Sequence, residues 1–490
     1  MNYKMIGRFI GKILLIEGAF MVPAMLISLI GKEYHVVWAY LWTLVIILAV
    51  AGLLTGLCRG SKKTFYAKEG LACVGLSWII MSLLGCLPLY ISGVTPHFID
   101  AFFEIVSGFT TTGASILPAV EGLPKGILYW RNFTNWLGGM GVLVFLLAIS
   151  SVGGSDNGFT MHLLRAESPG PNVEKLVPRM RQTARILYLL YIVLTVLAVI
   201  FFLFGGMPLF DAVCTALGTA GTGGFGIRND SMASYSPYIQ NVCTVFMLLF
   251  GVNFTCYYLL LIKQVKNVFK DEELRMYLGI VAGSILLIVW NLRGFYDTLG
   301  ETVRHAAFQV ATIMSTTGFA TTDFDLWPGF SKAILLCLMF IGASAGSTSG
   351  GFKCGRAILV LKSLHRSVRQ VVHPQKVQVV RVNGQPVEEK ILQNTNAYLA
   401  AYVIIIGISF LLVSIDGFSI TTNFSAVVSC FNNIGPGFEL VGPTGNFASY
   451  SVFSKLVLIM DMLAGRLEIF PIQILFSRTT WGTDKIEIFK

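Results

Sequence analysis

The chain has 490 residues, of which 54% are hydrophobic and only 13% are charged, and its mean hydropathy is +0.71. This composition is too apolar for a soluble multidomain protein, and it predicts an integral membrane protein that lies in a lipid bilayer. The formal net charge of +10 would suggest nucleic acid in a soluble protein. Here the basic residues fall mostly in alternate connections between apolar segments, so we expect no nucleic-acid partner.

Apolar segments long enough to cross a bilayer recur from one end of the chain to the other. The first two, at about 8–30 and 36–57, predict an N-terminal hairpin. Eight further spans are expected in pairs, at about 70–92 and 125–150, 184–205 and 237–262, 276–293 and 330–342 and beyond, and 396–415 and 451–477. Between the members of each pair lies an apolar segment too short to span, at about 98–110, 208–217, 300–314 and 421–431.

The pattern therefore predicts an all-α membrane protein with ten transmembrane helices and four re-entrant pore loops. Four pseudo-symmetric helix–pore-loop–helix repeats would surround a central pore. We divide the chain into an N-terminal hairpin, 1–60, and pore repeats at 61–155, 156–270, 271–390 and 391–490.

Basic residues give this arrangement an orientation. They concentrate in the connections 59–68, 162–185, 263–275 and 353–390, which we expect to be cytoplasmic because positively charged loops stay inside. Both termini would then be cytoplasmic, and all four short turns would face outward.

Each short segment ends in a turn rich in Thr, Gly or Asn. The four turns are Thr111-Thr112-Gly113, Thr222-Gly223-Gly224, Thr316-Thr317-Gly318 and Asn433-Ile434-Gly435. A single turn of this kind is usually only a loop, but four at repeat spacing indicate a shared axis where protein or water replaces the lost hydrogen bonds. Backbone carbonyls around such an axis can replace the hydration shell of a monovalent cation, glycine permits the necessary dihedrals, and helix C-termini add negative potential.

These motifs resemble the Trk/Ktr/HKT superfamily of potassium-uptake proteins, and more narrowly its TrkH type. The motifs that carry the resemblance are Thr112-Gly113-Ala114, Gly223-Gly224-Phe225, Thr317-Gly318-Phe319 and Asn432-Asn433-Ile434-Gly435-Pro436-Gly437. The resemblance implies a selectivity filter built on Gly113, Gly224, Gly318 and Gly435. Gly224 is preferred to Gly223 because Gly-Phe-x-x-x-Asn there matches Gly-Phe-x-x-x-Asp at Gly318.

By the same resemblance, glycine at all four positions implies potassium as the transported ion, whereas serine at the first goes with sodium. The alternatives are a sodium-permeable member of the superfamily and a cation-coupled secondary transporter, such as a symporter. A secondary transporter would predict two inverted halves. A membrane-embedded enzyme would need a cluster of His, Asp or Glu in the spans, which the sequence does not show. No organic cofactor is expected.

A stretch rich in Gly and Ser interrupts the second span of the third unit, at Gly346-Ser347-Thr348-Ser349-Gly350-Gly351. Such a stretch forms helix poorly and cannot face lipid. One interpretation is close helix packing through small residues. The other, which the resemblance supports, is a flexible intramembrane loop that gates the pore.

Charged residues within the spans are candidates for function by default. Arg466, in the last span, is placed by the resemblance beside the pore below the filter, where it would repel or gate cations. A structural ion pair with Asp461 or Glu468 is the alternative. Lys353 is either a second positive barrier or the first cytoplasmic charge, and Glu104 is expected to brace the filter by hydrogen bonding.

No phosphate-binding loop of the Gly-x-x-x-x-Gly-Lys-Ser/Thr type is present in the sequence. Energy and control would therefore come from the ion gradient and from a partner. The resemblance implies a cytosolic nucleotide-binding regulatory subunit of the TrkA type, docked mainly on 353–390. It also implies a homodimer, located in the cytoplasmic (inner) membrane.

Overall fold

The computed structural model describes residues 2–58, 67–141, 180–376 and 378–476, and these residues are mostly helical. The predicted all-α fold is confirmed. Within the described ranges, six helical segments are long and apolar enough to cross a membrane, or seven if one bent pair is counted as a span. The predicted end of the span 125–150, most of the connections 59–68 and 162–185, and the residues after 476 lie outside this description.

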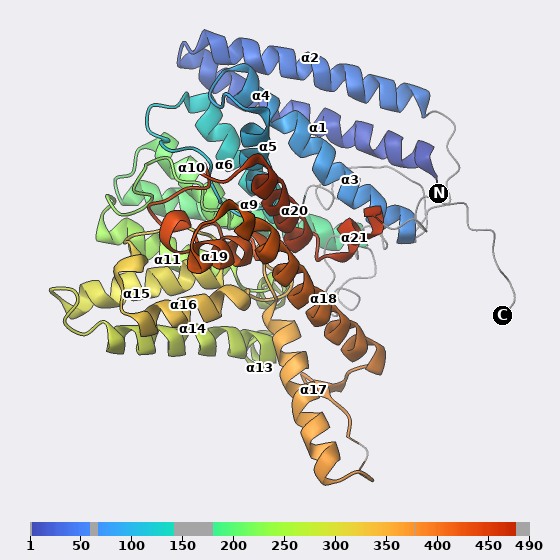
Figure 1. Ribbon diagram of the computed structural model, residues 1–490, viewed down its shortest axis with the longest axis vertical. Coiled ribbons are helices and arrows are strands. Elements are labelled where there is room, and N and C mark those ends of the chain that lie inside the picture. The colour runs from blue at the N-terminus through green and yellow to red at the C-terminus, as the bar shows by residue number, and fades with distance from the viewer. Residues whose placement is uncertain (1, 59–66, 142–179, 377, 477–490) are drawn as a thin grey trace, which may run out of the picture.

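The N-terminal hairpin lies beside the first unit (Figure 1). It consists of α1 (Tyr3–Ile30) and α2 (Tyr34–Leu57). Two polar contacts attach it to the following unit: the Tyr40 hydroxyl donates to the carbonyl of Gly126 at 3.1 Å, and the Glu33 carboxylate accepts the backbone N–H of Lys125 at 2.7 Å.

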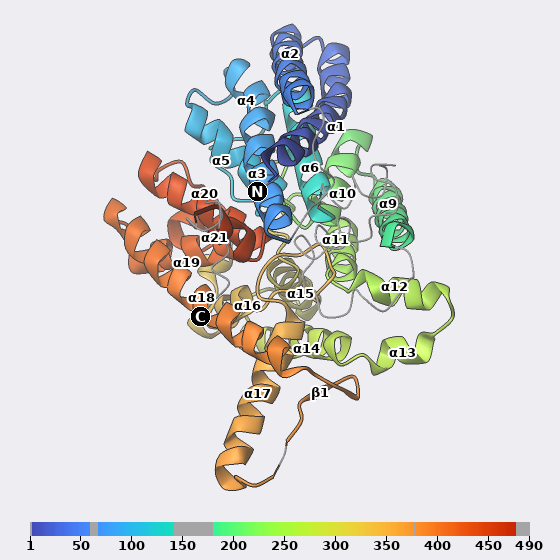
Figure 2. The same cartoon turned by 90° about the vertical axis from the view of Figure 1, so that its right-hand side faces the viewer.

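Four units follow in chain order around a common centre (Figure 2). The first contains α3 (Ala67–Gly85), α4 (Leu87–Ile91), α5 (Phe98–Phe109) and α6 (Lys125–Gly139). The second contains α9 (Met180–Phe204), α10 (Leu209–Gly221), α11 (Pro237–Phe250), α12 (Phe254–Leu261) and α13 (Val265–Lys270). The third contains α14 (Glu272–Asn291), α15 (Leu299–Met314), η2 (Phe324–Leu326), α16 (Gly329–Phe340) and α17 (Cys354–Val372). The fourth contains α18 (Glu389–Val413), η3 (Ser414–Asp416), α19 (Ile420–Phe431), η4 (Glu439–Val441), α20 (Val452–Arg466) and α21 (Phe470–Phe476).

The short helices α5, α10, α15 and α19 occupy the positions expected for the re-entrant segments. Capping side chains set the start of two of them: Thr298 accepts the N–H of Glu301 before α15, and Ser419 accepts the N–H of Thr422 before α19. Such caps satisfy N–H groups that the first turn of a helix leaves free. The C-terminal parts of all four helices are buried, so they point into the molecule.

The second long helix is broken in the second and fourth units, and here the expectation of continuous spans at 237–262 and 451–477 was wrong. Helices α11 and α12 bend by 88°, and the side chain of Asn253 caps the new start by accepting the N–H of Thr255. Helix α20 ends at Arg466, and the next turn contains Glu468 and Ile469 with φ of 57° and 68°. Apolar residues flank both breaks, so hydrophobicity alone did not reveal them.

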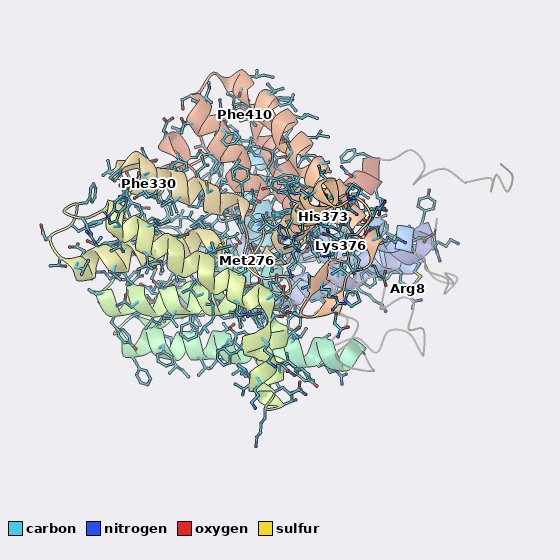
Figure 3. All side chains as sticks on the ribbon, turned by 90° about the horizontal axis from the view of Figure 1, so that it is seen from below. Arg8, Met276, Phe330, His373, Lys376 and Phe410 are labelled. Carbon is cyan, nitrogen blue, oxygen red and sulfur yellow. The ribbon has the colours of Figure 1, made fainter. Side chains whose placement is uncertain are left out.

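An arm projects from the rest of the molecule (Figures 1 and 2). It consists of α17, the antiparallel strands β1 (Arg381–Val382) and β2 (Gln385–Pro386), and the start of α18. Asn383 and Gly384 turn the hairpin with φ of 52° and 77°, as Asn-Gly commonly does in two-residue turns. Seen from below, His373 and Lys376 mark the end of the arm (Figure 3).

Candidate functional site

The four short helices end in the same backbone conformation. Thr111, Thr222 and Thr316 each have φ of 56°, and Asn433 has φ of 55°. The N–H of the next residue then returns to a carbonyl five residues earlier, as from Thr112 to Ser107 at 2.8 Å. This is the hydrogen bond of a Schellman helix ending. The four short helices therefore end in the same way, although the sequences of the four turns differ.

A glycine with positive φ follows each of these residues by two positions. The φ values are 77° at Gly113, 62° at Gly224, 91° at Gly318 and 101° at Gly435. Gly223 has no such value, so Gly224 is the structural counterpart of the other three glycines. We call residues 111–113, 222–224, 316–318 and 433–435 the four-loop ring.

The four-loop ring is closed, and each loop contacts the next one in the chain. A Cβ atom built on each glycine would come closer than 3.0 Å to a carbonyl oxygen of the following loop. The contacts run from Gly113 to Gly223, from Gly224 to Thr317, from Gly318 to Ile434, and from Gly435 back to Thr112. Only glycine fits at these four places, both because of φ and because of this close approach.

Left-handed backbone at β-branched threonine is strained, and neighbouring groups must hold it. The hydroxyl of Thr316 accepts the backbone N–H of Gly350 at 2.7 Å. The amide of Asn433 donates to the Thr112 hydroxyl at 3.0 Å and to the Met462 carbonyl at 2.9 Å. The twelve ring residues predicted as a filter therefore lie together, and parts of the chain far apart in sequence support them.

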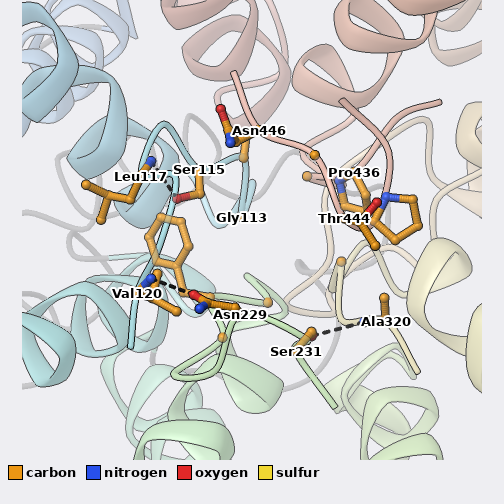
Figure 4. Close-up of a pocket in the computed structure, with 18 of the residues that line it drawn as sticks. Gly113, Ser115, Leu117, Val120, Asn229, Ser231, Ala320, Pro436, Thr444 and Asn446 are labelled. Carbon is orange, nitrogen blue, oxygen red and sulfur yellow. Dashed lines mark hydrogen bonds between the residues drawn. The ribbon is translucent and has the colours of Figure 1, made fainter. Parts of the chain in front are cut away.

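A hollow lies over one side of the ring and is lined by residues that follow all four glycines (Figure 4). We call it the mouth. Backbone N–H groups around it donate to neighbouring units. Val120 donates to the Asn229 side chain at 2.8 Å, Ala320 to the Ser231 hydroxyl at 3.1 Å, Glu439 to the Asp325 carboxylate at 2.7 Å, and Phe447 to the Ser115 carbonyl at 2.9 Å. Burial raises the pKa of Asp325, although the N–H of Glu439 opposes this shift.

Within the described part of the chain, the charged residues that line the mouth are Arg131 and Arg228. Arg131 forms an ion pair with Glu104, with Nη2 and Oε1 2.6 Å apart. Glu104 also accepts the backbone N–H of Ile116 at 2.9 Å, so the hydrogen bonding expected of it is present. Sequence reasoning overlooked Arg131, although a charge inside the apolar run 125–150 was a usable signal.

The Gly- and Ser-rich stretch crosses to the side of the ring away from the mouth. Its two ends are paired, because Gly342 donates to the Phe352 carbonyl at 3.0 Å and Cys354 to the Ala343 carbonyl at 3.1 Å. Between them, Gly350 lies against the backbone of the fourth loop, where an added Cβ would be 2.7 Å from the Asn432 carbonyl. Through Gly350, which also donates to Thr316, the predicted loop 346–351 thus contacts the third and fourth ring loops. We call residues 342–353 the intramembrane loop.

Arg466 joins three units beside this loop. It donates to the Thr348 carbonyl at 2.7 Å and to the Gly138 and Gly139 carbonyls at 2.5 and 2.7 Å. The last two carbonyls belong to the C-terminal end of α6, where a positive charge is favourable.

The charged neighbours of Arg466 have contacts of their own. Of the two acids considered as its partners, Asp461 accepts the Ser409 hydroxyl at 2.6 Å and Glu468 forms an ion pair with Arg356. Lys353 is buried and donates to the Ser349 carbonyl, so it is attached to the intramembrane loop itself.

Two further residues tie this loop to its surroundings, and the sequence reasoning missed both. Glu273, in the first turn of α14, accepts the N–H groups of Ala345 at 2.7 Å and Gly355 at 2.8 Å; Ala345 lies within the loop and Gly355 follows its end. Arg356, in the first turn of α17, binds Glu468 and stacks over the Tyr398 ring at 4.1 Å. In the sequence, Arg356 is only one of the basic residues in the connection 353–390, whose charge predicts a cytoplasmic position.

The family model named TrkH, described as cation transport protein, matches residues 39–292 and 296–482. The chain belongs to the TrkH family. It is 35% identical over 489 residues to the Trk system potassium uptake protein TrkH of Salmonella typhimurium, covering 98% of this chain and 100% of that one. It is 34% identical to TrkH of Escherichia coli K12, with the same coverage, and 32% identical to TrkG of that strain, covering 98% and 99%.

The crystal structure of the potassium transporter TrkH from Vibrio parahaemolyticus has the same fold. Its TM-score is 0.87 at 30% sequence identity, and the match covers 98% of this chain and 100% of that chain. Together with the apolar helices, membership of the TrkH family makes this chain a multi-pass membrane protein.

Proposed function

We propose that this protein takes up potassium across the cytoplasmic membrane through a selective, gated pore, as the ion-translocating subunit of a Trk-type system. The single observation that carries the proposal is the closed ring of four glycine-centred loops at the ends of four helices. The relatives named as potassium uptake proteins and the transporter with the same fold support the choice of ion.

The proposed filter consists of the four-loop ring. Its backbone carbonyls replace water around a dehydrated cation, while the C-terminal ends of α5, α10, α15 and α19 supply negative potential. Glycine at all four positive-φ positions supports potassium over sodium. The carbonyls and not the side chains are the proposed ligands, because the side chains differ between loops: the first two positions are Thr-Thr, Thr-Gly, Thr-Thr and Asn-Ile.

The proposed gate is the intramembrane loop together with Arg466. Loop residues Gly346, Ser347, Thr348, Ser349, Gly350 and Gly351 lie on the side of the ring away from the mouth, with Lys353 at their end. Arg466 holds the loop by its Thr348 carbonyl and adds a positive charge. A loop of this composition has several accessible backbone conformations, so it can move without disturbing the helices around it.

Replacing Arg356 with alanine is expected to raise basal cation flux severalfold. The Arg356–Glu468 ion pair links α17 to the turn directly after Arg466, so its loss frees that turn and loosens the gate. The measurement is rubidium flux in proteoliposomes. Arg366→Ala is the matched control. Arg366 lies farther along α17 than Arg356, and its ion pair is with Glu389 at the start of α18. Equal flux in the two variants would show that Arg356 has no part in gating.

The remaining features of the system are proposed from the family and the charge pattern. The basic connections and both termini face the cytoplasm, and a nucleotide-binding regulatory subunit of the TrkA type docks on 353–390. Helix α17 supports a homodimer, because it leaves apolar side chains exposed on a projecting arm. They are Leu361, Leu364, Val368, Val371 and Val372.

Growth of a bacterial strain that lacks its own potassium-uptake systems tests the proposal. Expression of this chain together with its regulatory subunit should restore growth at low external potassium, and the cells should accumulate rubidium. Gly318→Ala, which places a Cβ against the Ile434 carbonyl, should fail to restore growth although it reaches the membrane. If this variant restored growth as well as the wild type does, the proposed pore would be contradicted.

A further inference from the structure

The ion pair between Glu104 and Arg131 is almost completely removed from solvent. The exposed fractions of the two side chains are 0% and 1%. Two nitrogens of Arg131 approach the same carboxylate oxygen, Nε at 2.8 Å and Nη2 at 2.6 Å. The other oxygen accepts the backbone N–H of Ile116 at 2.9 Å, and the Ser115 hydroxyl donates to the carboxylate at 3.1 Å. A buried pair of this kind is stable only when such additional bonds are present.

Arg131 reaches from the first loop to the second. Its Nη1 donates to the Gly226 carbonyl at 3.4 Å, and its guanidinium lies over the Phe225 ring at 4.3 Å, an attractive cation–π geometry. Phe225 directly follows Gly224, and Ser115 lies two residues after Gly113. One side chain therefore contacts the outer ends of two adjacent ring loops, at the place where Gly113 meets the Gly223 carbonyl.

This brace breaks the fourfold pattern. Glu104 lies seven residues before the left-handed Thr111, and the same count from the other three left-handed residues gives Thr215, Gln309 and Ala426. Among these four equivalent positions only the first carries a charge. The first short helix thus carries a charge that the other three lack at this position. Because the other three form helix without it, the charge serves the contact between the first and second loops and is not needed to form the helix.

We propose that the Glu104–Arg131 pair fixes the spacing between the first and second ring loops and thereby sets the preference for potassium over sodium. This inference rests on the proposed function. Arg131 acts as a positioning residue, since Glu104 pairs with its charge and its contacts are with residues that follow the first two ring loops. Sodium is the smaller ion, so a ring that can contract accommodates it better; a rigid ring rejects it because the carbonyls cannot close around it.

The test compares rubidium and sodium flux in proteoliposomes containing the full-length chain. Glu104→Gln and Arg131→Gln should each lower the rubidium-to-sodium flux ratio about tenfold, a factor that corresponds to about 1.4 kcal/mol, while rubidium flux itself changes much less. Arg131→Lys keeps the charge but loses the forked geometry and the stacking on Phe225, so its ratio should be intermediate. Glu301→Gln is the matched control, because Glu301 is a half-exposed glutamate in the first turn of α15.

The outcomes separate this inference from the proposed function. Absence of rubidium flux in the wild type, with its regulatory subunit present, contradicts the proposed function. Selective flux in the wild type with an unchanged ratio in Glu104→Gln and Arg131→Gln overturns the inference alone. An equal fall of the rubidium-to-sodium flux ratio in Glu301→Gln overturns the inference as well. If the two glutamine variants and Arg131→Lys do not fold while Glu301→Gln does, the pair is a determinant of folding and the inference fails.

Discussion

Gly113→Ser is expected to lower the preference for potassium over sodium by at least about tenfold, equivalent to about 1.4 kcal/mol. Gly113 has φ of 77°, and a Cβ there would approach the Gly223 carbonyl more closely than 3.0 Å. The second loop must therefore shift, and a filter carbonyl moves with it. The measurement is the ratio of rubidium to sodium flux in proteoliposomes. An unchanged ratio would contradict the assignment of Gly113 to the filter.

A suitable control for Gly113→Ser is Gly122→Ser. Gly122 also has a positive φ, of 87°, but an added Cβ there meets no atom within 4 Å. Both variants therefore carry backbone strain, while only Gly113→Ser displaces a neighbouring loop. A fall in selectivity that is the same in both would be due to strain and not to the closed ring.

Arg466→Ala is expected to raise basal cation flux by on the order of tenfold to a hundredfold. A unit positive charge about 5 Å from a permeating cation opposes it by about 3 kcal/mol at an effective dielectric constant of 20, and the substitution removes this barrier. It also releases the Thr348 carbonyl of the intramembrane loop. The measurement is rubidium flux through purified protein without a regulatory subunit.

Arg466→Lys distinguishes the charge from the contacts. Lysine keeps the positive charge but cannot span the three carbonyls of Thr348, Gly138 and Gly139 that arginine reaches. We expect a smaller rise in flux than in Arg466→Ala. A protein that loses thermal stability in both variants without any rise in flux would instead support a purely structural role for Arg466.

Much of the architecture could be predicted, because the lengths of the apolar segments and the composition of the turns indicate the helices and their ends. The short helices α5, α15 and α19 lie within about one residue of the predicted segments, whereas α10 continues to Gly221, four residues past the predicted end. That difference arises because Gly218 and Gly221 look like helix-ending residues in the sequence, yet both are buried in the helix. Burial of the helix end overrides the low helix propensity of glycine.

The contacts around the ring could not be predicted, because each joins distant parts of the chain. Arg131 and Glu104 are 27 residues apart, and Arg356 and Glu468 are 112 apart. The helix breaks at 251–253 and 467–469 were missed for a different reason: apolar residues flank both breaks, so segment length alone predicted continuous spans. The Asn-Gly turn of the arm was recognisable from the sequence, but it lay in a connection that was considered only for its charge.

Flux through the purified protein in liposomes at a fixed membrane potential, with and without its regulatory subunit, tests the central claim most directly. We predict rubidium and potassium flux that follows the electrochemical gradient, exceeds sodium flux, and increases when the regulatory subunit is bound. Absence of flux for all three ions in the presence of the subunit, or equal flux of sodium and potassium, would contradict the proposal that the four-loop ring is a potassium-selective pore.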